Sequence, residues 1–143
     1  MHEYTVEFRI FGKELVPSDV TNELGLQPSQ VRNAGDRRDS HTSWQESLWA
    51  YDGCPASSGV KTWDSLEDGL RFVLLKLSPL KDKINSYSPR FGVIFWCGHF
   101  YSSFNGGPTL SPGVLRLLGE FGVEVFIDTY FSPEPEEMKG EDS

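Results

Sequence analysis

The sequence predicts a small α+β domain in which helices cover one face of a mainly antiparallel sheet. Three observations carry this prediction: two short helices that begin at a proline and end before a glycine, strand-like runs around each of them, and a longer amphipathic helix between them. Proline suits the first helical turn because its missing N–H has no partner there, and glycine enters the left-handed conformation that ends a helix. We therefore expect two βαβ-type halves joined by the amphipathic helix, a two-layer sandwich of ferredoxin-like type.

The first half opens with alternating apolar and polar side chains over residues 4–11, which predict a strand with one buried face. The first proline-led helix covers residues 17–24. Residues 43–51 predict a further strand, which forms a hairpin with a short strand near Val31. Residues 52–62 are rich in Gly, Pro and Ser, so we expect a loop there.

The second half begins with the amphipathic helix over residues 64–77, with Asp64 as its N-cap and a break near Pro79. Residues 91–100 are apolar at both odd and even positions, which predicts a central strand buried on both faces. The second proline-led helix covers residues 111–121, with Ser111 as its N-cap. The last strand, over residues 123–131, is expected nearer an edge of the sheet.

The composition fits one domain over residues 1–131 and an acidic, disordered tail over residues 132–143. The formal charge is −8, and the tail supplies −4 of it through five acidic residues and one lysine. An acidic body argues against nucleic-acid binding and permits a basic protein partner. No apolar run is long enough for a membrane span and no signal peptide is visible, so we expect a cytoplasmic protein, as a monomer or weak homodimer.

Catalytic and metal-binding patterns are absent from the sequence. Cys54 and Cys97 lack metal-ligand spacing, and Cys97 reads as a buried thiol. His99 shares the strand face of Cys97, but side chains two apart on a strand start roughly 7 Å apart, too far for a catalytic pair. The turn at residues 105–107 lacks the Lys-Ser/Thr of a phosphate loop, so we expect no cofactor. An enzyme that uses His41 or His99 is the least favoured hypothesis.

One charged cluster, followed by tryptophans, is the candidate interaction surface. Arginines beside an aromatic ring bind carboxylate or phosphate through paired hydrogen bonds, whereas a solvated loop with local ion pairs is the alternative interpretation. The candidate residues are Arg32, Asp36, Arg37, Arg38, His41, Trp44 and Trp49.

A family resemblance rests on the order of several short pieces. These are Phe8-Arg9-Ile10-Phe11-Gly12, Leu24-Gly25-Leu26, Gly35-Asp36, Trp44 and Trp49, Asn105-Gly106-Gly107, Leu110-Ser111-Pro112 and Phe121-Gly122-Val123-Glu124. Their order resembles a family of uncharacterised, mostly bacterial, single-domain proteins catalogued as domain of unknown function 4279. The resemblance covers nearly the whole chain apart from the tail, although residues 52–62 match nothing in it. It implies no established activity, and no catalytic residue is carried over.

The sequence therefore favours a protein-interaction module, of which a toxin-neutralising immunity protein is one concrete form. The alternative is a small-ligand sensor, because ferredoxin-like domains often bind metabolites; this rests on fold analogy.

Overall fold

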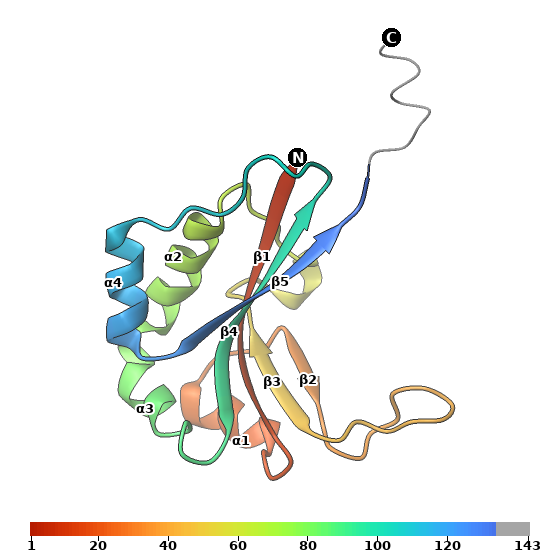
Figure 1. Cartoon of the computed structure of the whole chain (residues 1–143). Helices are drawn as coiled ribbons and strands as arrows, with labels where there is room; N and C mark the ends of the chain where they lie inside the picture. The colour runs from red at the N-terminus through yellow and green to blue at the C-terminus, as the bar shows by residue number, and fades with distance from the viewer. Residues whose placement is uncertain (134–143) are drawn as a thin grey trace.

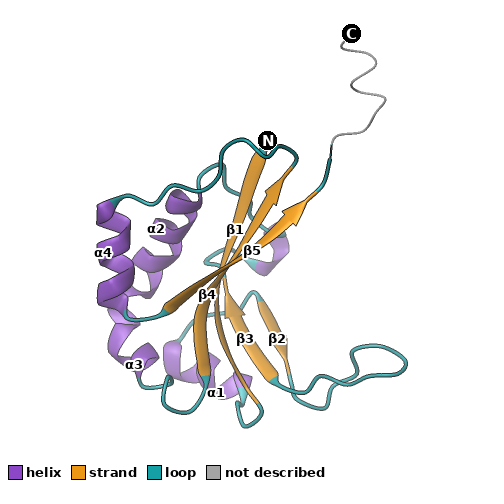
Figure 2. Ribbon diagram, viewed as in Figure 1, coloured by secondary structure: helices purple, strands orange, loops and turns teal. Residues whose placement is uncertain are grey.

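The computed structural model describes residues 1–133 and places five strands in one sheet, in the order β2-β3-β1-β4-β5 (Figure 1). The strands are β1 His2–Gly12, β2 Gln30–Arg32, β3 Ser47–Tyr51, β4 Gly92–Tyr101 and β5 Glu124–Phe131. The helices are α1 Pro17–Leu24, α2 Leu66–Leu77, α3 Lys81–Asn85 and α4 Pro112–Phe121, with short 3-10 turns η1 Ala56–Ser58 and η2 Ser78–Leu80. The α-helices gather on one side of the sheet (Figure 2), as the sequence predicts.

The sheet is mainly antiparallel, because β1 pairs antiparallel with both β3 and β4, and β2 pairs antiparallel with β3. Only β4 and β5 are parallel neighbours, joined through α4 as a βαβ unit. In the first half, β3 lies between β1 and β2, so these two strands run in the same direction without touching. The predicted places of the strands are confirmed: β1 and β4 are central and β5 is an edge strand.

The core lies between the sheet and the helices. The even-numbered residues of β1 and the odd-numbered residues of β3 and β4 point into this core from the same face of the sheet. Among them, Phe8, Trp49 and Phe95 are fully buried. Helix α2 packs on β1 at Gly69, where a Cβ atom would stand 2.8 Å from a methyl group of Val6. The glycine therefore permits a close approach that a larger residue would obstruct.

Two local predictions need correction, and one is confirmed. The N-cap of α2 is Ser65, whose hydroxyl accepts from the N–H of Asp68 at 3.3 Å, rather than Asp64. The strand predicted over residues 43–51 begins only at Ser47, because Ser43 and Trp44 pair with residues 35–37 instead. Pro79 does break the helix, since α2 gives way at residue 78 to a 3-10 turn and then α3.

Strand β4 is central but not buried on both faces, so that prediction is wrong. Its helix-facing side chains are buried, whereas Ile94 and Trp96 on the opposite face are half-buried and Phe100 is exposed. The chain carries apolar side chains on a sheet face that no α-helix of residues 1–133 covers.

Regular structure extends from His2 to Phe131, and the tail predicted over residues 132–143 lies, from residue 134 onward, outside the described residues. Within residues 1–133, no helix has the length and apolar character needed to cross a bilayer.

Candidate functional site

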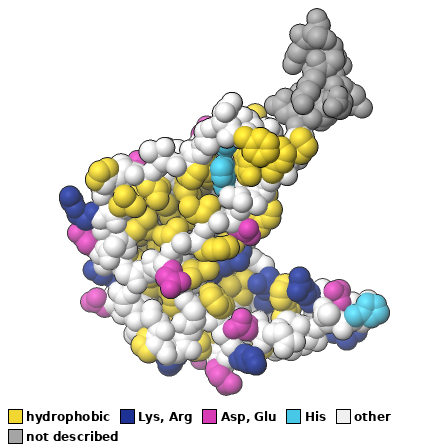
Figure 3. All heavy atoms as spheres, in the orientation of Figure 1, with side chains coloured by type: hydrophobic (Ala, Val, Ile, Leu, Met, Phe, Trp, Pro, Cys, Tyr) yellow, Lys and Arg dark blue, Asp and Glu magenta, His cyan; other side chains and the backbone are white. Residues whose placement is uncertain are grey.

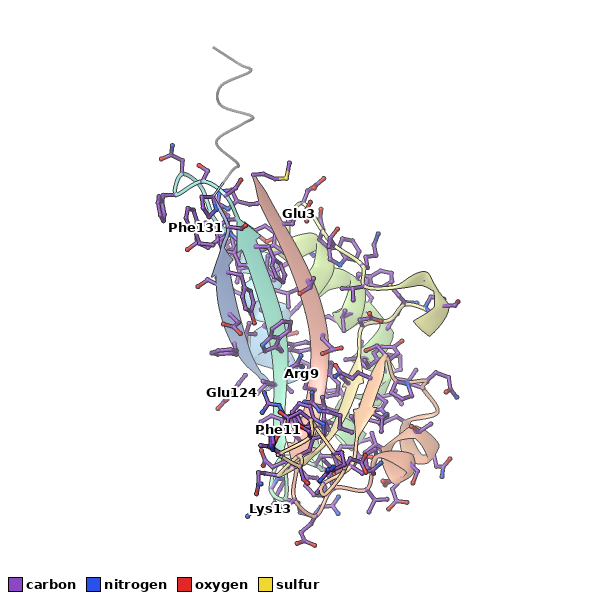
Figure 4. All side chains as sticks on the ribbon, turned by 90° about the vertical axis from the view of Figure 1, so that its right-hand side faces the viewer. Glu3, Arg9, Phe11, Lys13, Glu124 and Phe131 are labelled. Carbon is purple, nitrogen blue, oxygen red and sulfur yellow. The ribbon has the colours of Figure 1, made fainter. Side chains whose placement is uncertain are left out.

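The candidate site is the sheet face that points away from the helices, which we call the open face. In Figure 4 the strands stand in front of α2 and α4, with Arg9 and Phe11 labelled on β1. Polar and aromatic side chains from three strands share this face: Thr5, Glu7, Arg9, Phe11, Ile94, Trp96, Phe100, Phe126 and Tyr130. Small residues, Ala50 and Gly98, leave room for the longer side chains beside them.

A projecting hairpin, residues 33–46, borders the open face and is called the arm (Figure 1). Backbone hydrogen bonds close it, from the N–H of Arg38 to the carbonyl of Thr42 at 3.0 Å and from the N–H of Trp44 to the carbonyl of Asp36 at 2.8 Å. At its tip, the Asp39 carboxylate accepts from the N–H groups of His41 and Thr42, both at 2.8 Å, which lowers the pKa of Asp39. These bonds give the arm a defined shape.

Three arginines stack on two tryptophan rings between the arm and the sheet. The guanidinium carbon of Arg32 lies 3.8 Å from the ring centre of Trp44, and that of Arg38 lies 4.8 Å from the same ring. On the sheet, the guanidinium carbon of Arg9 lies 4.3 Å from the ring centre of Trp96. Such cation–π contacts hold each guanidinium plane in place and leave its N–H groups available at the edge.

The positive charge of this group is only partly compensated. Glu7 accepts a 2.7 Å charged hydrogen bond from Arg9 and another from the hydroxyl of Ser29 at 3.0 Å. The Nε atom of Arg32 is buried and has no hydrogen-bond partner. Burial lowers the pKa of Arg32, and the nearby charges of Arg9 and Arg38 lower it further, whereas the charge of Glu7 raises it. A cationic group that is only partly compensated, in partly desolvated surroundings, is typical of an anion-binding site.

Two hollows lie on the open face and meet at Arg9 and Trp96. The first, of about 430 Å³, is bounded by β1, β4 and the loop from Asp52 to Lys61. The second, of about 400 Å³, lies between the sheet and the arm and is lined by all three stacked arginines. Figure 3 shows basic and hydrophobic side chains together where the arm meets the body of the molecule. The hydroxyl of Thr5, a residue on the first hollow, is buried without a partner.

The structure brings together three of the seven residues predicted from the sequence: Arg32, Arg38 and Trp44. Three others belong to the arm without lining either hollow, namely Asp36, Arg37 and His41. Asp36 accepts from the N–H of Asn33 and so serves the shape of the arm, whereas Arg37 makes only a long, exposed contact, at 3.4 Å, with the carbonyl of Ser40.

Trp49 belongs to the opposite face of the sheet. It is 0% exposed, and its indole N–H donates to the hydroxyl of Thr21 on α1 at 3.0 Å. Its odd position in β3 points it toward the helices, whereas Trp44 precedes the strand and lies on the arm. Trp49 is therefore part of the core and not of an exposed surface.

Two important residues of the site, Arg9 and Trp96, are missing from the sequence-based set. Arg9 belongs to the polar face of the first strand and Trp96 to an apolar strand that the sequence reads as buried. The sequence does contain a signal for this face. The strand over residues 91–100 is apolar on both faces, whereas the predicted helices cover only one face of the sheet. This contrast predicts an uncovered apolar face, and a binding surface follows from it.

Comparison with known proteins supplies a family. The model of a domain of unknown function, DUF4279, matches residues 2–132. The chain belongs to the DUF4279 family. No curated protein and no solved structure matches it. The resemblance stated from the sequence is thus confirmed, and the open face with its two hollows is a feature of a DUF4279 domain.

A second polar cluster of this DUF4279 domain lies at the N-terminal end of β1. His2 and His99 are joined by a 2.8 Å hydrogen bond between Nδ1 and Nε2, and the other ring nitrogen of His2 lies against the carbonyl of Asn105. That nitrogen must donate, so Nδ1 of neutral His2 accepts and Nε2 of His99 donates. Tyr4 and Tyr101 stack on His99, with 4.7 and 4.8 Å between the ring centres. The cluster ties the loop at residues 105–107 to β1.

Acidification is expected to destabilise the protein through His99. Burial and the charge of His2 lower the pKa of His99 in the folded state, whereas in the unfolded chain it titrates near ~6.5. As the pH falls, the unfolded chain takes up the proton before the folded protein does. The contribution of His99 to the free energy of unfolding is therefore full above about pH 6.5 and decreases as the pH falls below that value. Urea unfolding between pH 7.5 and 5.5 measures the decrease.

The control for this titration is His41 at the exposed tip of the arm. His99→Gln should remove much of the slope of stability against pH in this range, and His41→Gln should keep it. An equal slope in His99→Gln and the unmodified protein would contradict this assignment.

Cys97 has no features of a nucleophile. It is 0% exposed, and burial raises the pKa of its thiol to about 12, so a reactive thiolate is disfavoured. The side chain of His99 forms its hydrogen bond with His2. Residues 1–133 contain no group of three or more side chains placed to hold a metal ion.

Proposed function

We propose that this DUF4279 protein is a protein-interaction module that binds an acidic, extended segment of a partner protein across the open face of its sheet. The observation that carries the proposal is the convergence of Arg9, Arg32 and Arg38 with two tryptophans on an uncovered face. Tryptophan and arginine are the side chains that most often dominate binding energy at protein interfaces. A fixed, partly exposed set of them beside hollows favours binding over catalysis.

The dimensions of the open face suit an extended segment. The second hollow runs from Phe126 on β5 to the level of Arg32 on β2, which is four strand spacings of ~4.8 Å. About six extended residues span this distance. The first hollow continues the surface from Arg9 and Trp96 toward Lys61.

The local charge selects the partner. The whole chain carries a charge of −8, from which a basic partner is expected, but the second hollow is lined by three arginines and one acidic residue, Glu46. Complementarity acts locally at an interface, so an acidic segment suits this face while the remaining surface repels acidic proteins. An immunity protein that neutralises a toxin is one form that such a module takes.

The finer fold assignment supports the same use. We propose a ferredoxin-like unit, β1-α1-β2-β3-α2-β4, extended by α4 and β5. Its support is the interleaving of the β1-α1-β2 and β3-α2-β4 units in the sheet.

The two thiols, Cys54 and Cys97, are both unpaired, which favours a reducing compartment such as the cytoplasm.

A small-ligand sensor is the second candidate. It is favoured by the volumes of the hollows, about 430 and 400 Å³, which lie within the range of small-molecule sites. An organic anion would then use the same arginines.

A selection from a random dodecapeptide library on the immobilised full chain tests the proposal. Counter-selection uses the double variant Arg9→Gln/Arg38→Gln, which keeps an unbranched polar side chain but removes two charges. We expect enriched peptides with several Asp or Glu residues and an apolar residue, which lose at least about tenfold in affinity on the double variant.

The matched control is Arg90→Ala, because Arg90 also stacks on an aromatic ring, Phe91 at 5.1 Å, but lies outside both hollows of the open face. This variant should bind the enriched peptides like the unmodified protein. Enrichment of peptides without acidic residues, or no enrichment together with stabilisation by small organic anions in thermal unfolding, would overturn the proposal in favour of another partner or the sensor.

A further inference from the structure

We propose that the guanidinium groups of Arg9, Arg32 and Arg38 form one oxyanion-binding site at the junction of the arm and the sheet, which accepts a carboxylate or a phosphate monoester. This inference rests on the proposed function and names the chemistry of its anchor. The ligand group lies in the second hollow and accepts N–H bonds from two or more of the three arginines.

Charge is the first argument for an anion at this place. Among residues 1–133 the only ion pair is that of Arg9 with Glu7, which leaves Arg32 and Arg38 without carboxylate partners. The charges of Arg9 and Arg38 both disfavour the charge on Arg32, and Glu7 opposes them only in part. An oxyanion between them converts this repulsion into attraction.

The orphaned donor on Arg32 is the second argument. Its Nε is buried and makes no hydrogen bond, although a guanidinium group carries five N–H donors. Buried polar groups are nearly always bonded, so an exception indicates a missing acceptor. The Nε atom itself is closed to solvent, so an anion in the adjoining second hollow, which Arg32 lines, meets this guanidinium group at its other N–H donors.

Preorganisation is the third argument. Trp44 positions both Arg32 and Arg38, and Trp96 positions Arg9, before any ligand binds. The backbone bonds of the arm hold Trp44 itself. Side chains already fixed in their bound geometry lose little conformational entropy on binding, which raises affinity.

The lining of the hollow adds to the fit. Ser43 and Gln45 supply neutral polar groups, while Phe11, Ile94 and Phe126 form apolar walls. The walls reduce the exposure of the anion to water and so strengthen its interaction with the arginines. They also offer contact to an apolar group attached to the anion.

The test is a titration of the full-length chain with inorganic phosphate and, separately, with acetate, at constant ionic strength maintained with chloride. Tryptophan fluorescence reports binding directly, because Trp44 and Trp96 both line the hollow. We expect a saturable change with at least one of the two anions. Tighter phosphate binding points to a phosphate monoester, and tighter acetate binding points to a carboxylate.

Two variants on the arm separate a site from general electrostatics. Arg38→Ala removes a stacked guanidinium group and should weaken binding about tenfold or more, as expected for a charged hydrogen bond. Arg37→Ala removes the same charge from the neighbouring position, which lines neither hollow, and should change the affinity less than about twofold. Equal weakening in the two variants, or no saturable change with either anion, overturns the inference.

A third variant, Arg32→Lys, keeps the positive charge but loses the planar guanidinium group and its paired N–H donors. It should weaken binding about as much as Arg38→Ala if paired hydrogen bonds matter, and unchanged affinity contradicts that geometry. Phosphate binding without any enriched peptide would support the oxyanion site and remove the protein-interaction proposal. Enriched peptides that bind the Arg32 and Arg38 variants as tightly as the unmodified chain would support the protein-interaction proposal and remove the oxyanion site.

Discussion

Replacement of Trp49 by alanine is expected to lower the free energy of unfolding by about 3–5 kcal/mol, the range for removing a large buried aromatic side chain. The indole ring is 0% exposed and stacks on Tyr51 at 6.0 Å between ring centres, with Phe8 edge-on at 6.3 Å. The substitution leaves a cavity between the sheet and α1, and it leaves the hydroxyl of Thr21 without its donor. Urea unfolding followed by circular dichroism measures this loss.

Trp44→Ala is the matched comparison, because Trp44 lies on the arm and outside the core. It should cost only about 1 kcal/mol, the scale of its two cation–π contacts, and yet it should reduce anion binding by releasing Arg32 and Arg38. Trp49→Phe should recover part of the stability lost in Trp49→Ala. Similar losses of stability in Trp44→Ala and Trp49→Ala would contradict the division between site and core.

The different places of these two tryptophans show how far the sequence alone leads. Alternation within residues 43–51 puts Trp44 and Trp49 on opposite faces of any strand that includes both. Their closeness in sequence nevertheless suggests one surface. Burial decides between them, and burial depends on which face the helices cover, a property of the assembled sheet and not of the segment.

The elements with strong local signals are predicted well. The proline and glycine at the ends of α1 and α4 fix those helices, and the left-handed backbone of Gly25 and Gly122 agrees with their predicted role. Alternation in residues 4–11 predicts both faces of β1, including the polar face that carries Arg9. These signals depend on neighbouring residues alone.

The open face depends on contacts between distant residues, so no single segment of the sequence predicts it. Arg9 stacks on Trp96, 87 positions later in the chain, because β1 and β4 are paired. Arg32 meets Arg38 through Trp44, because the arm turns back on itself at Asp39. Strand registers and loop shapes of this kind leave no short-range periodic pattern in the sequence. Only the assembled structure therefore reveals the group of three arginines.

Arg32→Met is expected to stabilise the protein while it removes the anion site. The substitution keeps an unbranched side chain of similar length beside Trp44 and Leu48, but it removes an unbonded buried donor and the repulsion from Arg9 and Arg38. Removing an unsatisfied buried donor is worth ~1–3 kcal/mol, and the lost cation–π contact offsets ~0.5–1 kcal/mol of it. We expect a net gain of about 1 kcal/mol in the free energy of unfolding.

The same variant should lose at least about tenfold in affinity for the anion that binds the unmodified chain. Opposite changes in stability and binding are what functional residues produce, because a chain selected for stability alone would not gather three cations around a single ion pair. Urea unfolding and the phosphate and acetate titrations, done on one preparation, measure both. Loss of stability in Arg32→Met would mean that Arg32 holds the arm to the sheet as a structural residue, and the three arginines would then owe their arrangement to packing.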